Sequence, residues 1–132
     1  MPKHSLQVIQ QIRLKTVETL PDAAIVIAGD GEIIDMNEEA EFLFGYARDD
    51  LIGKPLNTLM PEEYRERHSV NLHTFFKAPK RREMGTGMKL EGLHRDGERF
   101  LVQIKLAPIL VSGEAGGVFG LAIVRRSHGN AA

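Results

Sequence analysis

The chain has 132 residues, of which 42% are hydrophobic and 27% charged, and its formal net charge is -1. This length and composition fit one globular domain, and the balanced charge gives no general attraction to nucleic acid or to an anionic membrane surface. The absence of cysteine excludes disulfides, thiolate metal sites and cysteine nucleophiles. Because no apolar run approaches the roughly 18 residues of a membrane helix, we expect a cytoplasmic domain that binds neither nucleic acid nor membrane.

The first twenty residues predict an amphipathic helix. Apolar residues recur at spacings of three to five among Gln, Lys, Arg and Glu and give one narrow apolar stripe: Leu6, Ile9, Ile12, Val17 and Leu20. Pro21 ends this helix. Because a lone helix cannot bury such a stripe, we expect residues 1–20 to lie on the sheet or to pair with a second copy.

The next residues predict a β-hairpin and then a capped helix. Residues 23–28 and 32–35 are β-rich runs on either side of Gly29-Asp30-Gly31, which is a hairpin signal. Asn37 is placed to cap the following helix, and Gly45 to end it. Residues 49–55 then predict a single helical turn closed by glycine and proline.

A longer helix is predicted from Pro61 to about Lys77, since proline suits a first helical position and two glutamates follow it. One side of this helix carries an aromatic and apolar set that includes one histidine: Tyr64, His68, Leu72 and Phe75 or Phe76. The opposite side carries Arg65, Glu66, Ser69 and His73.

The last third of the chain predicts strands. A basic irregular stretch over residues 77–82 precedes a glycine-interrupted strand over residues 84–93 and a turn over residues 94–97. Residues 100–106 alternate with a period of two, and residues 118–124 form the last strand after a turn at 113–117. This order predicts an α+β domain with a five-stranded antiparallel sheet and helices on one face, preceded by the N-terminal helix.

Several segments of the chain resemble the PAS family, namely residues 22–27, 31–37, 40–46, 51–56 and 94–100. The resemblance covers roughly residues 20 to 126 and implies the PAS fold. We therefore divide the chain into the N-terminal helix (1–20), which would serve dimerisation and signal transmission, a PAS sensor domain (21–126) and a tail (127–132).

One part of the sequence resembles the haem-binding PAS domains of bacterial oxygen-sensor kinases. These residues are 59–68, together with Met84-Gly85-Thr86-Gly87. The resemblance implies a haem b cofactor whose iron is bound by His68, in a pocket that also includes Tyr64 and Leu72, with Arg82 as a partner of a haem propionate. A histidine on an apolar helix face is also typical of a hydrogen-bonded core residue, so both interpretations of His68 stay open.

The sequence departs from that subfamily at two positions. Met88 stands where the oxygen sensors have a distal arginine, and Thr74 replaces an arginine near the haem propionates. Met84 or Met88 is either a sixth iron ligand, which would favour a redox or carbon monoxide response, or part of the packing. The remaining histidines have no metal-binding spacing, and we expect them on the surface: His4, His73, His94 and His128.

The PAS resemblance implies a sensory domain of a signal-transduction protein, as in two-component systems. A small ligand or a cofactor such as haem, for gas or redox sensing, would change the domain and pass the signal to an output domain or signalling partner. The second interpretation is a cofactor-free module for protein–protein interaction. Because the sequence has no recognisable catalytic motif, we expect no enzymatic activity from this chain. We also expect a parallel homodimer through residues 1–20 and the neighbouring sheet.

Overall fold

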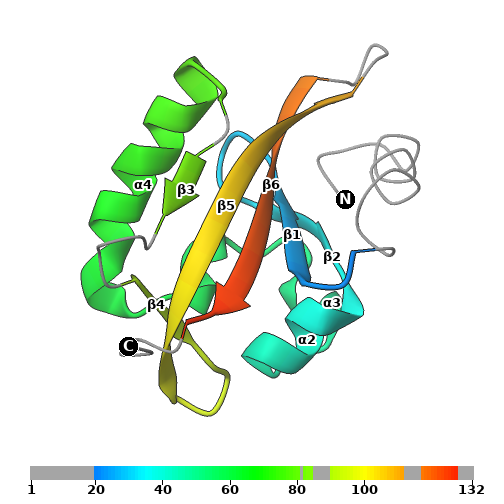
Figure 1. Ribbon diagram of the computed structural model, residues 1–132, viewed down its shortest axis with the longest axis vertical. Coiled ribbons are helices and arrows are strands. Elements are labelled where there is room, and N and C mark those ends of the chain that lie inside the picture. The colour runs from blue at the N-terminus through cyan, green and yellow to red at the C-terminus, as the bar shows by residue number, and fades with distance from the viewer. Residues whose placement is uncertain (1–19, 81, 85–89, 112–116, 128–132) are drawn as a thin grey trace.

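The computed structural model describes residues 20–80, 82–84, 90–111 and 117–127 (Figure 1). Within these residues an antiparallel sheet packs against a layer of helices, so the predicted α+β architecture is confirmed. The helix expected over residues 1–20 lies outside the described residues except for Leu20. In the described part of the chain, no helix combines the length and the apolar character needed to cross a membrane.

The predicted hairpin and the capped helix are both present. Strands β1 (Ala23–Ile27) and β2 (Ile33–Met36) pair antiparallel, and helix α2 (Glu38–Phe44) follows. The Asn37 side-chain oxygen accepts hydrogen bonds from the backbone N–H groups of Ala40, at 3.0 Å, and Ala24, at 2.9 Å. The same amide therefore caps α2 and fixes the helix to β1. Gly45 ends α2 in the left-handed region, with a φ of 78°.

Three helical segments follow α2. They are α3 (Arg48–Leu51), the 3-10 helix η2 (Leu56–Leu59) and α4 (Glu62–Lys77). The long helix agrees with its predicted bounds, whereas η2 was not predicted. A part-buried ion pair holds α3 against β2, since Arg48 Nε lies 2.6 Å from the Oδ1 atom of the fully buried Asp35.

The remaining strands complete a sheet that is five positions wide. The order is β2-β1-β6-β5-β3, where β3 is Arg82–Met84, β5 is Arg99–Val111 and β6 is Gly117–Arg126. Strand β4 (Leu90–Leu93) pairs with β5 further along the same edge. The strand predicted over residues 84–93 is therefore two short described strands, and residues 85–89 between them lie outside the described residues.

Among the described residues, the buried apolar side chains form two clusters on opposite faces of the sheet. In β1, Ile25 and Ile27 belong to the main cluster beneath the helices, while Val26 belongs to the second cluster together with Ala28. This alternation follows from the two-residue period of a strand. The helices contribute Phe44, Leu51, Leu59 and Phe75 to the main cluster.

Candidate functional site

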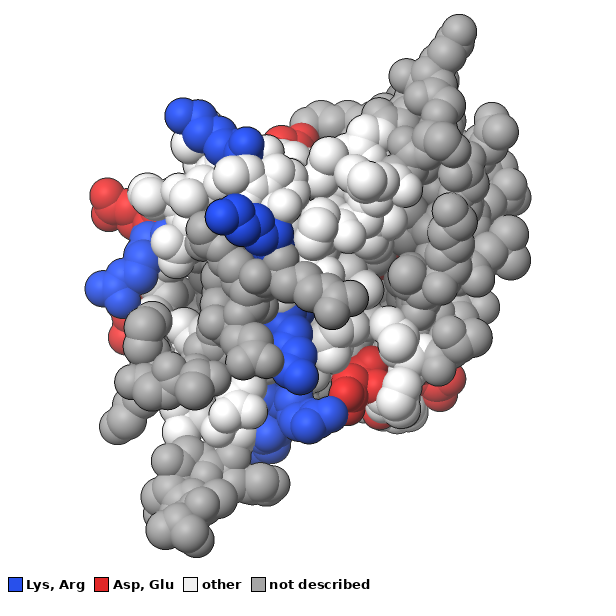
Figure 2. All heavy atoms as spheres, turned by 45° about the horizontal axis from the view of Figure 1, so that its top comes forward, with Lys and Arg blue, Asp and Glu red and all other residues white. Residues whose placement is uncertain are grey.

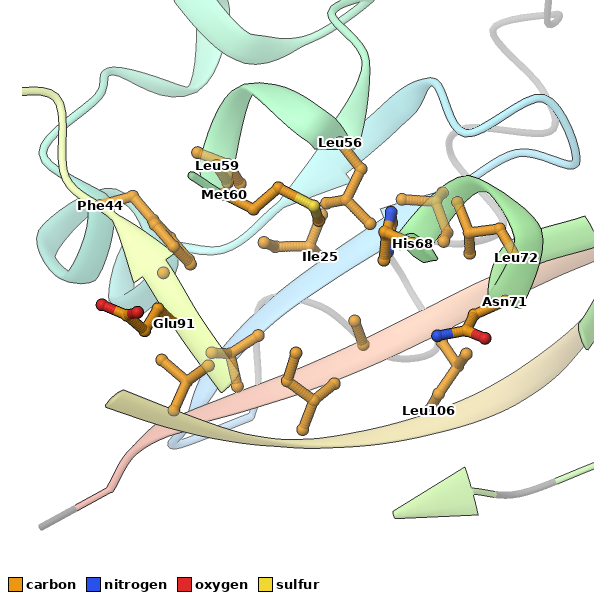
Figure 3. A pocket seen from close by; sticks show the side chains of 16 residues that line it. Ile25, Phe44, Leu56, Leu59, Met60, His68, Asn71, Leu72, Glu91 and Leu106 are labelled. Carbon is orange, nitrogen blue, oxygen red and sulfur yellow. The ribbon is translucent and has the colours of Figure 1, made fainter. Parts of the chain in front are cut away.

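A small apolar cavity lies between α4, η2 and the sheet (Figure 3). Its volume is about 70 Å³, and three of its described lining residues are polar: His68, Asn71 and Glu91. The described apolar lining comes from every layer around it: Ile25, Ile27, Phe44, Leu56, Leu59, Met60, Leu72, Gly92, Val102, Ile104, Leu106, Ala122 and Val124. Phe44 and Glu91 lie at one end of the cavity in Figure 3, and Leu72 and Asn71 lie at the other.

The size of the cavity limits what it can hold. An engineered apolar cavity of roughly 150 Å³ stays dry and binds benzene, and this cavity, at about 70 Å³, has about half that volume. It therefore has room for a gas atom or molecule or for a short alkyl group. A larger guest requires the lining side chains to move.

His68 faces this cavity from α4, on the side of the helix that the sequence predicted. Burial lowers the pKa of His68 from its usual value of 6.5 to about 4. The Nδ1 atom lies 3.2 Å from Asn57 Oδ1. Because an amide oxygen only accepts hydrogen bonds, Nδ1 carries the proton and Nε2 keeps the lone pair. At neutral pH His68 is thus an uncharged imidazole with one nitrogen available to a ligand.

Tyr64 lies beside the cavity rather than among its described lining residues. Its hydroxyl donates a 2.8 Å hydrogen bond to Glu91 Oε1, and this bond raises the pKa of Tyr64. One residue earlier in α4, Glu63 accepts two 2.8 Å hydrogen bonds from the Arg99 guanidinium. The first turns of α4 are therefore fixed to β4 and β5 by two adjacent polar contacts, which we call the α4 clamp.

Haem does not fit this cavity as its side chains stand. The donor chemistry is suitable, because a neutral imidazole is a good iron ligand. The space is not, because pockets for drug-sized ligands measure roughly 300–1,000 Å³ and this cavity measures about 70 Å³. Leu56, Met60 and Leu72 are among the side chains that would have to move apart to admit a porphyrin.

The structure describes the positions of only some of the other predicted site residues. Leu72 lines the cavity. Arg82 and Met84 belong to β3, whose backbone alone is described, and Met88 lies outside the described residues. Among the histidines expected on the surface, His73 is exposed, while the half-buried ring of His94 packs against Gly45. His4 and His128 lie outside the described residues, and no cluster of metal-ligating side chains occurs in the part of the chain that is described.

Sequence reasoning did not find the polar partners of the predicted residues. Asn57 is 11 positions before His68, and Glu91 is 27 positions after Tyr64, so no local periodicity connects the members of either pair. The sequence did offer a reason to consider Met60 as a site residue, since it lies within residues 59–68, the segment that resembles the haem-binding subfamily.

Charged side chains do not define a competing site on the face in Figure 2. The described Lys and Arg side chains in this view lie in several separate places, and Asp and Glu side chains lie close to some of them. Such an arrangement is typical of a solvated surface with both signs of charge. The cavity beside His68 is therefore the candidate functional site.

Comparison with known proteins gives one consistent family. A family model described as the PAS fold matches residues 13–124. Sensor protein FixL of Bradyrhizobium diazoefficiens is 35% identical over 98 residues, which are 74% of this chain and 19% of that protein. Oxygen sensor protein DosP of Escherichia coli is 28% identical over 102 residues, which are 77% of this chain and 12% of that protein.

A solved structure shows the same architecture. The PAS domain of a protein from Colwellia psychrerythraea superimposes with a TM-score of 0.71 at 26% identity, over 90% of this chain and 97% of that chain. By contrast, this chain spans less than a fifth of the length of either sensor protein, 19% in one case and 12% in the other. The likeness to the sensor proteins therefore concerns one domain of each.

Proposed function

The chain belongs to the PAS family, and we propose that it is the sensory domain of a signal-transduction protein that binds a small ligand in the cavity beside His68. The observation that carries this proposal is the apolar cavity between α4 and the sheet, with a neutral imidazole in its wall. An output domain or a signalling partner would receive the change. A histidine kinase outside this chain would be one such output.

The α4 clamp supports a route from the cavity to the sheet. A signal requires two arrangements of the domain that bind the ligand with different affinity. The Tyr64 and Glu63 side chains connect α4 to β4 and β5 at one edge of the sheet, and Glu91 belongs both to the clamp and to the described cavity lining. A ligand that displaces α4 would therefore change contacts on the sheet directly.

Xenon tests whether the cavity accepts a guest. We expect xenon under pressure to shift the amide NMR signals of Ala122 and Val124, which line the cavity from β6. The signal of the exposed Leu110 serves as the control. Unchanged signals at both cavity positions, at xenon pressures that saturate known apolar cavities, would refute the proposed ligand site.

Haem is a second candidate ligand. The neutral imidazole of His68 in the cavity wall favours it, and the cavity volume opposes it. Absorption spectra of the purified protein, before and after addition of haemin, show whether haem binds. A Soret band that His68→Ala abolishes and His73→Ala preserves would establish haem ligation, since His73 lies on the same helix but is exposed. Absence of a Soret band in the wild type would exclude it.

We also propose that the domain forms a parallel homodimer through residues 1–20 and the sheet face away from the helices. Beside the second apolar cluster, that face carries Ile109 and Leu121, which are only partly buried within one chain. Sedimentation velocity should give a dimer for the wild type and a folded monomer for the double variant Ile9→Glu/Ile12→Glu. A dimer in both proteins would move the interface elsewhere. A dimer that binds neither xenon nor haemin would favour a cofactor-free interaction module.

A further inference from the structure

A second hollow lies on the surface directly outside the cavity. It measures about 210 Å³ and lies between the β1–β2 turn, η2 and α4. The polar side chains in its described lining come from all three places, namely Asp30, Asn57, Ser69 and His73. Its character therefore differs from that of the apolar cavity, and we call it the outer hollow.

Two leucines separate the outer hollow from the cavity. Leu56, the first residue of η2, and Leu72 of α4 line both spaces. Both leucines are half-buried, and in Figure 3 their side chains lie on either side of His68. Because a leucine side chain can change rotamer without a backbone shift, the two spaces can be joined by rearrangement of these two side chains.

The cavity and the outer hollow suit different parts of one ligand, because the first is apolar and the second is polar. The cavity accepts an alkyl group of about three or four carbons, given its volume of about 70 Å³. The outer hollow presents the Asp30 carboxylate, whose Oδ1 also accepts a 3.0 Å hydrogen bond from the backbone N–H of Glu32. The Ser69 hydroxyl there donates its proton to the Arg65 carbonyl, so its oxygen can still accept. A carboxylate and a hydroxyl oxygen suit a ligand group that donates hydrogen bonds, and the carboxylate repels an anion.

We propose that the cavity and the outer hollow form one binding site for a short aliphatic chain with a hydrogen-bond-donating head, an alcohol or an amine. The far end of the chain occupies the cavity, the carbons next to the head pass between Leu56 and Leu72, and the head lies in the outer hollow. Leu56 and Leu72 are the gate between the two spaces. This inference rests on the proposed function, since it names the ligand class of the same cavity. It also places the ligand's polar end at the surface between η2 and α4.

NMR titration with 1-hexanol, hexylamine and hexanoate tests this ligand class. We expect 1-hexanol or hexylamine to shift the amide signals of Gly31 and Ser69 in the outer hollow and of Ala122 and Val124 in the cavity, with one common saturation curve. Hexanoate should bind at least tenfold more weakly than the better of the other two. Equal binding of hexanoate, or separate saturation curves for the two sets of signals, would overturn the proposal.

Two variants distinguish a single site from two independent ones. Ala122→Val enlarges a side chain that lines the cavity but not the outer hollow. It should weaken binding at least fivefold, including the response at Ser69. Leu72→Ala opens the gate and should speed ligand exchange. This variant tests the proposal independently if Ala122→Val does not fold. Leu110→Ala, at an exposed position outside both spaces, is the control. Xenon binding without any binding of the hexyl compounds refutes this inference and leaves the proposed function intact, whereas absence of both refutes both.

Discussion

Replacement of His68 by glutamine should remove a large part of the acid sensitivity of the fold. The imidazole is half-buried beside the cavity, and the desolvation there lowers its pKa from 6.5 to about 4. In the unfolded chain the same group has its ordinary pKa and binds a proton at higher pH. Proton binding by His68 therefore favours the unfolded state. Its effect on the free energy of unfolding is small above pH 6.5, and the protein loses stability as the pH falls from 6.5 towards 4.

The magnitude follows from those two pKa values. With a pKa of about 4 in the folded state and 6.5 in the unfolded state, linkage gives a loss of about 2 kcal/mol between pH 7 and pH 5 and about 3 kcal/mol by pH 4. His68→Gln removes the titration but keeps a side chain that can donate a hydrogen bond to Asn57.

Urea unfolding at pH 7, 6, 5 and 4 measures this dependence. We expect the free energy of unfolding of wild type to fall more steeply with acidity than that of His68→Gln, by about 2 kcal/mol at pH 5. His73→Gln, an exposed change on the same helix, should retain the wild-type profile. If wild type and His68→Gln lose stability in parallel from pH 7 to pH 4, the imidazole is not buried as described.

Three further substitutions test the packing around the site, each by urea unfolding at pH 7. Phe75→Ala should lower the free energy of unfolding by about 3–5 kcal/mol, because this fully buried ring belongs to the main cluster; a loss below 1 kcal/mol would contradict that placement. Asn37→Ala should cost about 2 kcal/mol, since it removes both the cap of α2 and the hydrogen bond to β1. Gly45→Ala should lower the free energy of unfolding more than Gly53→Ala does. Both glycines have a positive φ, but of the two only Gly45 would bring a Cβ against another residue, 2.3 Å from the His94 ring. Equal losses of stability in the two variants would show that the His94 ring moves freely.

The sequence was most informative where a few neighbouring residues decide the structure. Asn37 and Gly45 set the ends of α2, and Pro61 preceded the start of α4, because caps and backbone preferences act within one turn. The period of two over residues 100–106 predicted the strand that is β5, although the strand continues to Val111. The helical period of α4 likewise gave the side of the helix on which His68 and Leu72 line the cavity.

Tertiary structure decided everything that depends on residues distant in sequence. Three contacts join side chains on separate elements: the hydrogen bond between His68 and Asn57, the α4 clamp and the part-buried Asp35–Arg48 pair. The cavity volume has the same origin, because it is the small remainder left after side chains from five or more elements have packed together. The amino-acid sequence therefore places His68 on the cavity side of α4, but only the packed fold determines how much space lies in front of it.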